Sequence, residues 1–289
     1  MTDWTAAQLP SFAGRTVIIT GANSGLGEIT ARELAATGAT IIMAVRNTQK
    51  GHLAARNMRG QVEVRELDLQ NLSSVREFAD GVDRADILIN NAGVMGVTYA
   101  ETIDGFESQI GTNHLGHFVL TNLLLPKLAD RVVTVSSMAH WAGRISLDDL
   151  NWKKRRYRPW LAYAQSKLAN LLFTSELQRR LQAAGSPLRA VAAHPGYSHT
   201  NLQGATGRQL SDTLMSAATS VFATNADFGA RQTLYAASRD IPGDTFVGPR
   251  FGSFGRTQAV GRSKAAHDAA TATALWQLSE QLTKTTFPL

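Results

Sequence analysis

The sequence predicts an α/β protein built on a doubly wound parallel sheet, with residues 1–289 forming a single domain. Three observations carry this prediction. Short apolar strands alternate with helical patterns along the chain, which is typical of a parallel sheet covered on both faces. A glycine-rich turn joins the first strand directly to the first helix. The chain also shows no internal repeat and no low-complexity linker that would divide it into two domains.

The first strand and the turn after it organise the rest. Residues 16–20 form a β-branched run typical of a buried strand, and Leu26, Ile29 and Leu34 then follow helical spacing. A helix that begins directly after such a turn points its free N–H groups and positive dipole end at a ligand, which suits a phosphate. The spacing Gly-x-x-x-Gly-x-Gly also fits an ordinary strand-to-helix turn. The residues predicted to bind a phosphate-containing cofactor here are Gly21, Asn23, Ser24, Gly25, Leu26 and Gly27.

The other elements follow in order along the chain. Residues 1–13 form a lead-in whose Trp4 and Phe12 are expected to pack on the edge of the domain. Apolar runs predict further strands at 39–45, 61–67, 86–90, 131–136, 188–193 and 245–247. Helical spacing predicts a helix ending near 58, then helices at 72–82, 110–125, 163–181 and 226–238, and a C-terminal helix at about 264–282. The polar stretch at about 197–225 is predicted to be a substrate loop.

Ligands of parallel sheets bind at the carboxyl ends of the strands. This rule brings to one edge of the sheet six residues that lie far apart in the sequence: Gly21, Arg46, Asp68, Asn90, Ser137 and His194.

Composition excludes several classes of function. The chain has no cysteine, so it has no disulfide, no thiolate nucleophile and no cysteine-ligated metal. The net charge is +6, but the basic residues are scattered, and the one dense run at 153–158 fits a solvated loop, so we expect no nucleic-acid partner. Because no long apolar run occurs, we expect a cytoplasmic protein without an integral membrane segment.

Tyr163 and Lys167 lie four residues apart at the start of the predicted helix at 163–181, and therefore on one helical face. A nearby lysine ammonium favours the phenolate and lowers the pKa of a tyrosine, which makes the phenol able to exchange a proton with an alcohol or a carbonyl. Ser137, after the fifth strand, lies at the same edge of the sheet. The alternative is an ordinary core tyrosine beside a surface lysine.

Several short motifs occur along the chain: Thr20-Gly-Ala-Asn-Ser-Gly-Leu-Gly27, Asp68-Leu69, Asn90-Asn-Ala-Gly93, Thr112-Asn-His-Leu-Gly-His-Phe118, Val135-Ser-Ser137, Tyr163-Ala-Gln-Ser-Lys167 and Pro195-Gly196 with Thr200. In their order and spacings they resemble the short-chain dehydrogenase/reductase family over nearly the whole chain, and within it the retinol-dehydrogenase-like branch. The C-terminal ending resembles bacterial members of that branch. The resemblance implies a Rossmann-like fold.

The resemblance implies an enzyme that interconverts an alcohol and a carbonyl by hydride transfer with a nicotinamide cofactor, and needs no metal. By this resemblance Tyr163 transfers the proton, and Ser137 rather than Ser136 holds the substrate oxygen. Lys167 binds the nicotinamide ribose, and Asn113 positions a water that links Lys167 to solvent. It assigns further cofactor contacts to Asp68, Leu69, Asn91, Ala92, Gly93, Pro195, Gly196 and Thr200. The alternative function is a non-enzymatic nucleotide-sensing regulator on the same fold.

The choice of cofactor depends on the end of the second strand. Members of the family that prefer NAD carry an acidic residue there, whereas this chain has Arg46 followed by Asn47. A guanidinium offers a planar set of donors to a 2′-phosphate, so we expect a preference for NADP(H) over NAD(H), with Lys50 assisting. A solvated arginine after a strand is the alternative.

His114 and His117 share a helical face, but no third ligand is evident, so we expect them not to bind a metal. By resemblance, a small-molecule substrate of bulky, apolar, retinoid-, steroid- or aromatic-like character meets a cleft near Met95, Met138, His140, Trp141, Tyr197 and His199. Ordinary packing explains each of these side chains equally well. By analogy, a homo-oligomer would form through the helix after Asn113 and the helix of Tyr163.

Overall fold

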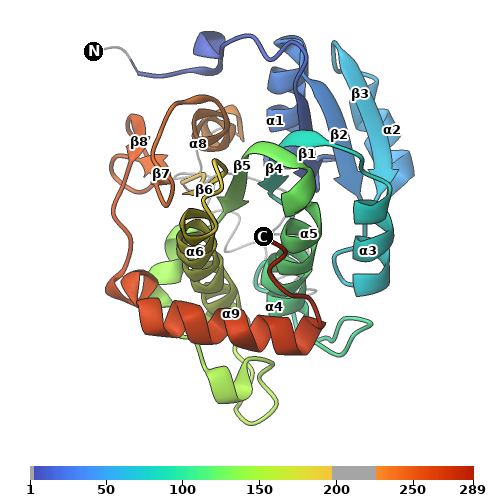
Figure 1. Ribbon diagram of the computed structural model, residues 1–289. Coiled ribbons are helices and arrows are strands. Elements are labelled where there is room, and N and C mark those ends of the chain that lie inside the picture. The colour runs from blue at the N-terminus through green and yellow to red at the C-terminus, as the bar shows by residue number, and fades with distance from the viewer. Residues whose placement is uncertain (1–2, 197–225) are drawn as a thin grey trace, which may run out of the picture.

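A computed structural model describes residues 3–196 and 226–289 of the chain. Over these residues it contains an eight-stranded sheet in the order β3-β2-β1-β4-β5-β6-β7-β8 (Figure 1). Neighbouring strands are parallel except for β8, which pairs antiparallel with β7. The bounds are β1 Thr16–Thr20, β2 Thr40–Val45, β3 Gln61–Glu66, β4 Ala85–Asn90, β5 Leu128–Val135, β6 Arg189–Ala193, β7 Phe246–Pro249 and β8 Thr257–Ala259. This arrangement confirms the predicted fold class. The sequence analysis missed β8, because three residues are too short to give a period.

Helices cover both faces of the sheet. One face carries α1 (Gly25–Ala36), α2 (Thr48–Ala55) and α8 (Ala226–Ser238). The other carries α3 (Leu72–Asp80), α5 (Gly116–Leu124) and α6 (Pro159–Ala183). A further helix, α9 (Ala269–Thr283), runs across the outside of α6 and reaches α5 (Figure 1). No helix in the described part of the chain is long and apolar enough to cross a membrane.

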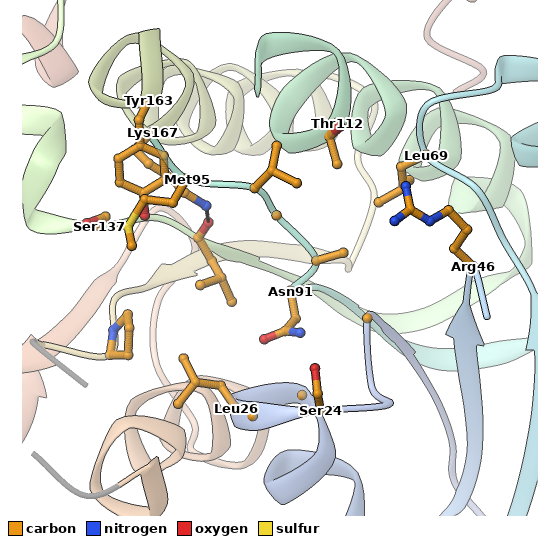
Figure 2. A pocket seen from close by; sticks show the side chains of 18 of the residues that line it. Ser24, Leu26, Arg46, Leu69, Asn91, Met95, Thr112, Ser137, Tyr163 and Lys167 are labelled. Atoms are coloured by element: carbon orange, nitrogen blue, oxygen red, sulfur yellow. Dashed lines mark hydrogen bonds between the residues drawn. The ribbon is translucent and has the colours of Figure 1, made fainter. Parts of the chain in front are cut away.

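The parallel strands bring their carboxyl ends to one edge of the sheet. The ends of β1, β2, β4 and β5, with the start of α1, border a cleft of about 620 Å³ (Figure 2). In a doubly wound sheet each helix returns the chain to the opposite edge, where the next strand begins. This edge is therefore left open for a ligand.

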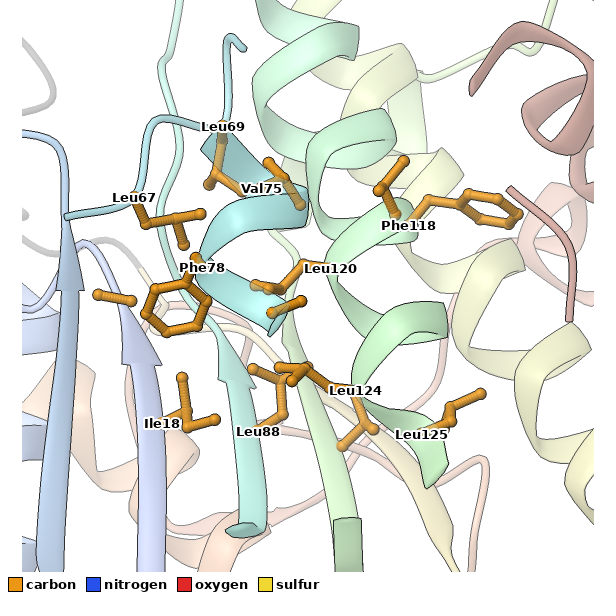
Figure 3. Packing of buried hydrophobic residues seen from close by; sticks show 14 of the residues in the cluster. Ile18, Leu67, Leu69, Val75, Phe78, Leu88, Phe118, Leu120, Leu124 and Leu125 are labelled. Atoms are coloured by element: carbon orange, nitrogen blue, oxygen red, sulfur yellow. The ribbon is translucent and has the colours of Figure 1, made fainter. Parts of the chain in front are cut away.

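The core forms because successive residues of a strand point to opposite faces. In β1, Val17 and Ile19 pack toward α1 and α8, while Ile18 packs toward α3 and α5. Figure 3 shows Ile18 and Leu88 beneath Phe78 on this second face. Each fully buried aliphatic side chain of this kind contributes about 2 kcal/mol, which explains why both faces need apolar residues.

Both ends of the chain pack against the rest of the molecule. Trp4 and Phe12 are buried in a hydrophobic cluster that also contains residues of α1 and α8. The C-terminal helix predicted at 264–282 is divided: a 3₁₀ turn, Lys264–His267, comes first, and α9 then begins at Ala269. The division occurs because the Asp268 carboxylate accepts the Thr271 N–H and so caps α9.

Helix α6 begins one turn earlier than predicted. Pro159 opens it, because proline lacks the N–H that a first helical turn leaves unpaired. Tyr163 therefore lies in the second turn, held by helix on both sides.

The helix predicted at 110–125 is also not uniform. A short α4, Ser108–Ile110, leads into a π-helix, Gly111–Leu115, before α5 begins. In the π-helix the Gly116 N–H bonds the Gly111 carbonyl, five residues back. Such insertions are frequent at functional sites.

Candidate active site

The turn after β1 needs its glycines. Gly21 and Gly25 have φ of 66° and 57°, in the left-handed region that only glycine enters freely. At Gly27 a Cβ atom would lie 2.5 Å from Asn91 Nδ2 and 2.6 Å from the Gly21 carbonyl oxygen. The glycine spacing therefore lets α1 begin directly against the ends of β1 and β4.

The N-terminus of α1 opens onto the cleft. Ser24 is the N-cap residue, and within the described chain its side chain makes no capping bond to the helix. By contrast, Asn47 caps α2 by accepting the Lys50 N–H at 2.9 Å. The residues of this turn predicted to bind phosphate, Gly21 and Asn23 to Gly27, all line the cleft.

Thr20, the last residue of β1, organises the opposite wall. Its Oγ1 accepts the N–H groups of Asn91 and Ala92, both at 2.9 Å. The Asn91 side chain bonds back to the Thr20 carbonyl at 2.8 Å. The segment from Asn91 to Gly93 is thereby fixed along the cleft, where the sequence analysis expected it.

The two ends of the cleft differ in character. Figure 2 shows Arg46 and Leu69 at one end and Tyr163, Lys167 and Ser137 at the other. Asp68, Lys50, Pro195 and Gly196 line it as well, whereas Thr200 lies outside the described residues. Two lining residues that the sequence analysis did not single out are Gln70 and Thr112, which bond each other at 3.1 Å.

Ser136 and Ser137 have different tasks. The Ser136 hydroxyl is buried and donates to the Lys167 carbonyl at 2.7 Å, so it holds α6 against β5. Ser137 lines the cleft, where its hydroxyl also accepts the Ala139 N–H at 3.2 Å. Ser136 lines the cleft as well, but its hydroxyl already bonds α6.

Tyr163 and Lys167 lie together, with the lysine Nζ 5.6 Å from the centre of the tyrosine ring. Nζ donates to the Val135 carbonyl at 3.1 Å. Burial raises the pKa of Tyr163 to about 12, although its interaction with Ser137 acts in the other direction. Burial lowers the pKa of Lys167 to about 8. The expected lowering of the Tyr163 pKa is therefore wrong, because desolvation of the phenol dominates.

Asn113 is buried behind the cleft wall and holds it in place. Its Oδ1 accepts the Val94 N–H at 2.8 Å, and its Nδ2 donates to the Val94 carbonyl and to Ser166 Oγ, both at 2.9 Å. These bonds fix the wall beside Lys167, because a Cβ atom on Gly93 would lie 3.6 Å from Lys167 Nζ.

The side chains expected to meet a substrate are divided. Met95 and Met138 line the cleft. His140 does not meet it, because the ring is fully buried, with Nδ1 on the Ser137 carbonyl at 2.7 Å and Nε2 on the Ser263 N–H at 3.1 Å. Trp141 is 57% exposed. Tyr197 and His199 lie outside the described residues.

Trp160 is a cleft residue that was not singled out from the sequence. It lies one turn before Tyr163 on α6, and that spacing was the signal that could have identified it.

The other rim residues are buried. Asn90 donates to Thr121 Oγ1 at 2.9 Å, and His194 accepts the Gly196 N–H at 3.2 Å, which holds the turn after β6. His114 and His117 are also buried, and no group of three or more potential metal ligands occurs in residues 3–196 and 226–289.

Comparison with known proteins identifies the relatives of the chain. The family model for short chain dehydrogenases matches residues 15–211. Human retinol dehydrogenase 13 is 52% identical over 207 residues, which are 67% of this chain and 62% of the human protein. Mouse retinol dehydrogenase 14 is 41% identical over 296 residues, covering 92% of this chain and 85% of the mouse protein.

Solved structures agree. A crystal structure of an uncharacterized protein from Mycobacterium paratuberculosis is 74% identical with a TM-score of 0.90, covering 100% of both chains. A Beutenbergia cavernae protein, provisionally assigned as an NAD(P)-dependent gluconate 5-dehydrogenase and solved with NADP at low occupancy, is 25% identical with a TM-score of 0.61, covering 79% of this chain and 91% of that one. With its sheet order and glycine turn, this chain belongs to the short-chain dehydrogenase family, in the retinol-dehydrogenase-like branch.

Proposed function

We propose that the chain is an NADP(H)-dependent oxidoreductase that interconverts an alcohol and a carbonyl on a bulky apolar substrate. The observation that carries this proposal is the meeting of two groups in one cleft: the Tyr163 phenol beside Ser137 at one end, and the open N-terminus of α1 along its side. When bound there, the nicotinamide would supply or accept the hydride.

The side chains of the cleft handle the proton. With a pKa of about 12 the Tyr163 phenol stays protonated at neutral pH, so it can donate to a carbonyl oxygen as that oxygen gains charge. Ser137 holds the same oxygen through its hydroxyl. In the opposite direction Tyr163 must accept the alcohol proton, which needs its phenolate and therefore a lower pKa. The positive charge of Lys167 favours that phenolate.

The cleft fits a dinucleotide. Gly27 lies so close to Asn91 that this position has no room for a side chain. The first turn of α1, which the Ser24 side chain does not cap, can therefore offer its N–H groups to a pyrophosphate. We assign the adenine end to Asp68 and Leu69, the adenine ribose to Asn91–Gly93, and the nicotinamide end to Lys167, Pro195 and Gly196.

Preference for NADP(H) is proposed from Arg46. This side chain is exposed at the end of β2 and lines the cleft next to Asn47 and Lys50. A guanidinium and an ammonium at this corner would pair with a 2′-phosphate, and residues 44–47 at the end of β2 include no carboxylate for a free 2′-hydroxyl.

The substrate class is proposed from the other end of the cleft. Met95, Met138 and Trp160 give this end thioether and aromatic surfaces, which suit a bulky apolar molecule. The relatives named retinol dehydrogenase support a retinoid-like substrate among the candidates. We therefore propose retinoid, steroid or aromatic carbonyls and alcohols as substrates.

Tyr163→Phe tests the proposal. The variant should lose turnover by at least about 100-fold, because it lacks the phenolic proton, while keeping its affinity for NADPH. The assay follows absorbance of the reduced nicotinamide with a panel of retinoid, steroid and aromatic carbonyls. A nucleotide-sensing regulator on this fold would bind NADPH but turn over none of the panel, and Tyr163→Phe would then change nothing.

The outer face of α5 and α6 bears on the proposed homo-oligomer. Trp276 of α9 packs there against Phe118 and Phe173, with ring centres 4.9 and 5.6 Å away. Because α9 already occupies this face, we propose that a second copy would use another surface than the one expected by analogy.

A further inference from the structure

His117 joins the two sides of the cleft wall. It lies on α5 with 2% of its surface exposed. Its Nε2 is 2.9 Å from Thr20 Oγ1, and its Nδ1 is 3.1 Å from the Asn113 carbonyl oxygen. Thr20 ends β1, and Asn113 lies in the π-helix. The imidazole therefore links two segments that lie far apart in the sequence, by about as many residues as a small domain contains.

The bonds of Thr20 determine which nitrogen of His117 carries the proton. A hydroxyl has one hydrogen and two lone pairs. The N–H groups of Asn91 and Ala92 occupy both lone pairs. The hydroxyl hydrogen therefore faces either His117 Nε2 at 2.9 Å or the Ile89 carbonyl oxygen at 3.4 Å, and the shorter contact makes Nε2 its acceptor. The remaining hydrogen lies on Nδ1 and is donated to the Asn113 carbonyl. His117 is thus a neutral imidazole in a single tautomer.

These bonds close a ring around the cleft wall. Thr20 holds Asn91 and Ala92, Asn113 holds Val94 through both its amide atoms, and His117 connects Thr20 to Asn113. The glycine between them, Gly93, lies against Lys167. The ring therefore fixes the distance between the cofactor-binding wall and the lysine.

We propose that His117 is a positioning residue that keeps the Asn91–Val94 wall in register with Lys167, so that cofactor binding and proton transfer share one geometry. This inference rests on the proposed function for its effect on turnover, but not for its effect on the structure of the wall. Lys167 and His114 are the titratable groups near the ring, and burial together with the charge of Lys167 keeps the pKa of His117 low, at about 4.

His114 provides a matched control. It lies three residues earlier, is equally buried, and bonds Ser279 of α9 at 3.0 Å, away from the cleft. Replacing either histidine by leucine removes a buried imidazole from the same helical segment. Only the His117 replacement breaks the ring.

The first experiment compares His117→Leu with His114→Leu. We expect His117→Leu to lower kcat about tenfold or more, because small misplacements of reacting groups are costly, and to raise the Kd of NADPH measured by fluorescence. His114→Leu should lose comparable stability but keep kcat and Kd within about twofold of the unmodified protein, because its effects are those of an ordinary core substitution. Equal kinetic losses in the two variants would overturn the proposal.

Two conservative variants test the two hydrogen bonds of His117 separately. His117→Asn can still donate to the Asn113 carbonyl, as Asn122 donates to the carbonyl of Phe118 four residues back at 2.9 Å. His117→Gln is long enough to reach Thr20. We expect each variant to recover part of the loss seen in His117→Leu. Recovery by neither variant would leave only packing as the role of His117 and would refute the proposal.

A last measurement does not depend on activity. Nitrogen-15 spectra of the ligand-free protein should show His117 at pH 7 as a neutral ring protonated on Nδ1, with the signal assigned by its loss in His117→Asn. An imidazole protonated on Nε2, or on both nitrogens, would contradict the hydrogen bonds proposed between His117, Thr20 and Asn113. If the unmodified protein turned over no substrate, the proposed function would fail, while the spectra and the NADPH affinities would still decide this inference.

Discussion

Trp160 stands edge-on to Tyr163, with ring centres 6.2 Å apart and planes at 87°. Its ring also packs over Gly96, where a Cβ atom would lie 3.4 Å from the indole. Because it is 46% exposed and lines the cleft, the indole offers a large apolar face next to the phenol. Trp160 is therefore placed to contact whatever part of a substrate extends beyond the reacting carbon.

Trp160→Ala should weaken the binding of bulky substrates. We expect KM for a retinoid or aromatic carbonyl to rise about 10- to 100-fold, because the loss of one apolar contact weakens the binding free energy of the substrate by a few kcal/mol at most. The KM of NADPH should stay unchanged. Leu161→Ala is the control, because Leu161 follows on the same helix and is 38% exposed. If the two variants gave the same KM values, Trp160 would not contact the substrate.

Arg46→Ser should remove the preference for NADP(H). We expect the KM of NADPH to rise about 10- to 100-fold, because a bond to a charged phosphate is worth about 1.5–3 kcal/mol, with little change for NADH. Arg56→Ser changes the net charge equally at another exposed position near α2 and should leave both KM values as they are. An unmodified protein that used NADH more efficiently than NADPH would reject the assignment.

Much of this arrangement could be predicted from sequence because its causes are local. Parallel strands buried on both faces need runs such as Val17-Ile18-Ile19, and a helix that begins against a strand end needs Gly27. These patterns lie within a few residues of each other. They located the glycine turn after β1, the strand ends and Ser137 in one cleft.

The remainder depends on contacts between distant residues. For His140 the sequence left a place in the cleft and ordinary packing equally open. The structure shows packing, because the ring is held by Ser137 and by Ser263, which is 123 residues away. The π-helix at Gly111–Leu115 is a single turn with i→i+5 bonds, which is too short to be recognised from apolar spacing. The raised pKa of Tyr163 follows from its burial, which the Tyr-x-x-x-Lys spacing does not reveal.

Trp276→Ala should be strongly destabilising. The indole is 2% exposed, stacks on Phe173 at 5.6 Å, and donates to Glu280 Oε1 at 2.9 Å. We expect a loss of about 3–5 kcal/mol in the free energy of unfolding, measured with urea, since the change leaves a large cavity. Trp141→Ala removes the same side chain where it is 57% exposed and should cost less than about 0.5 kcal/mol. Similar losses in the two variants would mean that α9 is not packed on α5 and α6.

Three buried histidines predict a loss of stability in mild acid. Burial lowers the pKa of His114 to about 3, and those of His117 and His194 to about 4. Below the ordinary histidine pKa of about 6.5 the unfolded chain binds protons that the folded chain does not, so the free energy of unfolding falls as the pH falls. The stability is complete above about pH 6.5 and is lost progressively toward pH 4.

His114→Leu isolates one of these contributions, because His114 lies away from the cleft. Urea unfolding of both proteins at pH 7 and pH 4 gives two differences in stability. The difference between the two pH values should be smaller in the variant by about 3.5 kcal/mol, because pH 4 lies about 2.5 pH units below the ordinary histidine pKa and each pH unit is worth about 1.4 kcal/mol. Parallel pH dependences in the two proteins would mean that His114 is already protonated, or equally solvated, in the folded state.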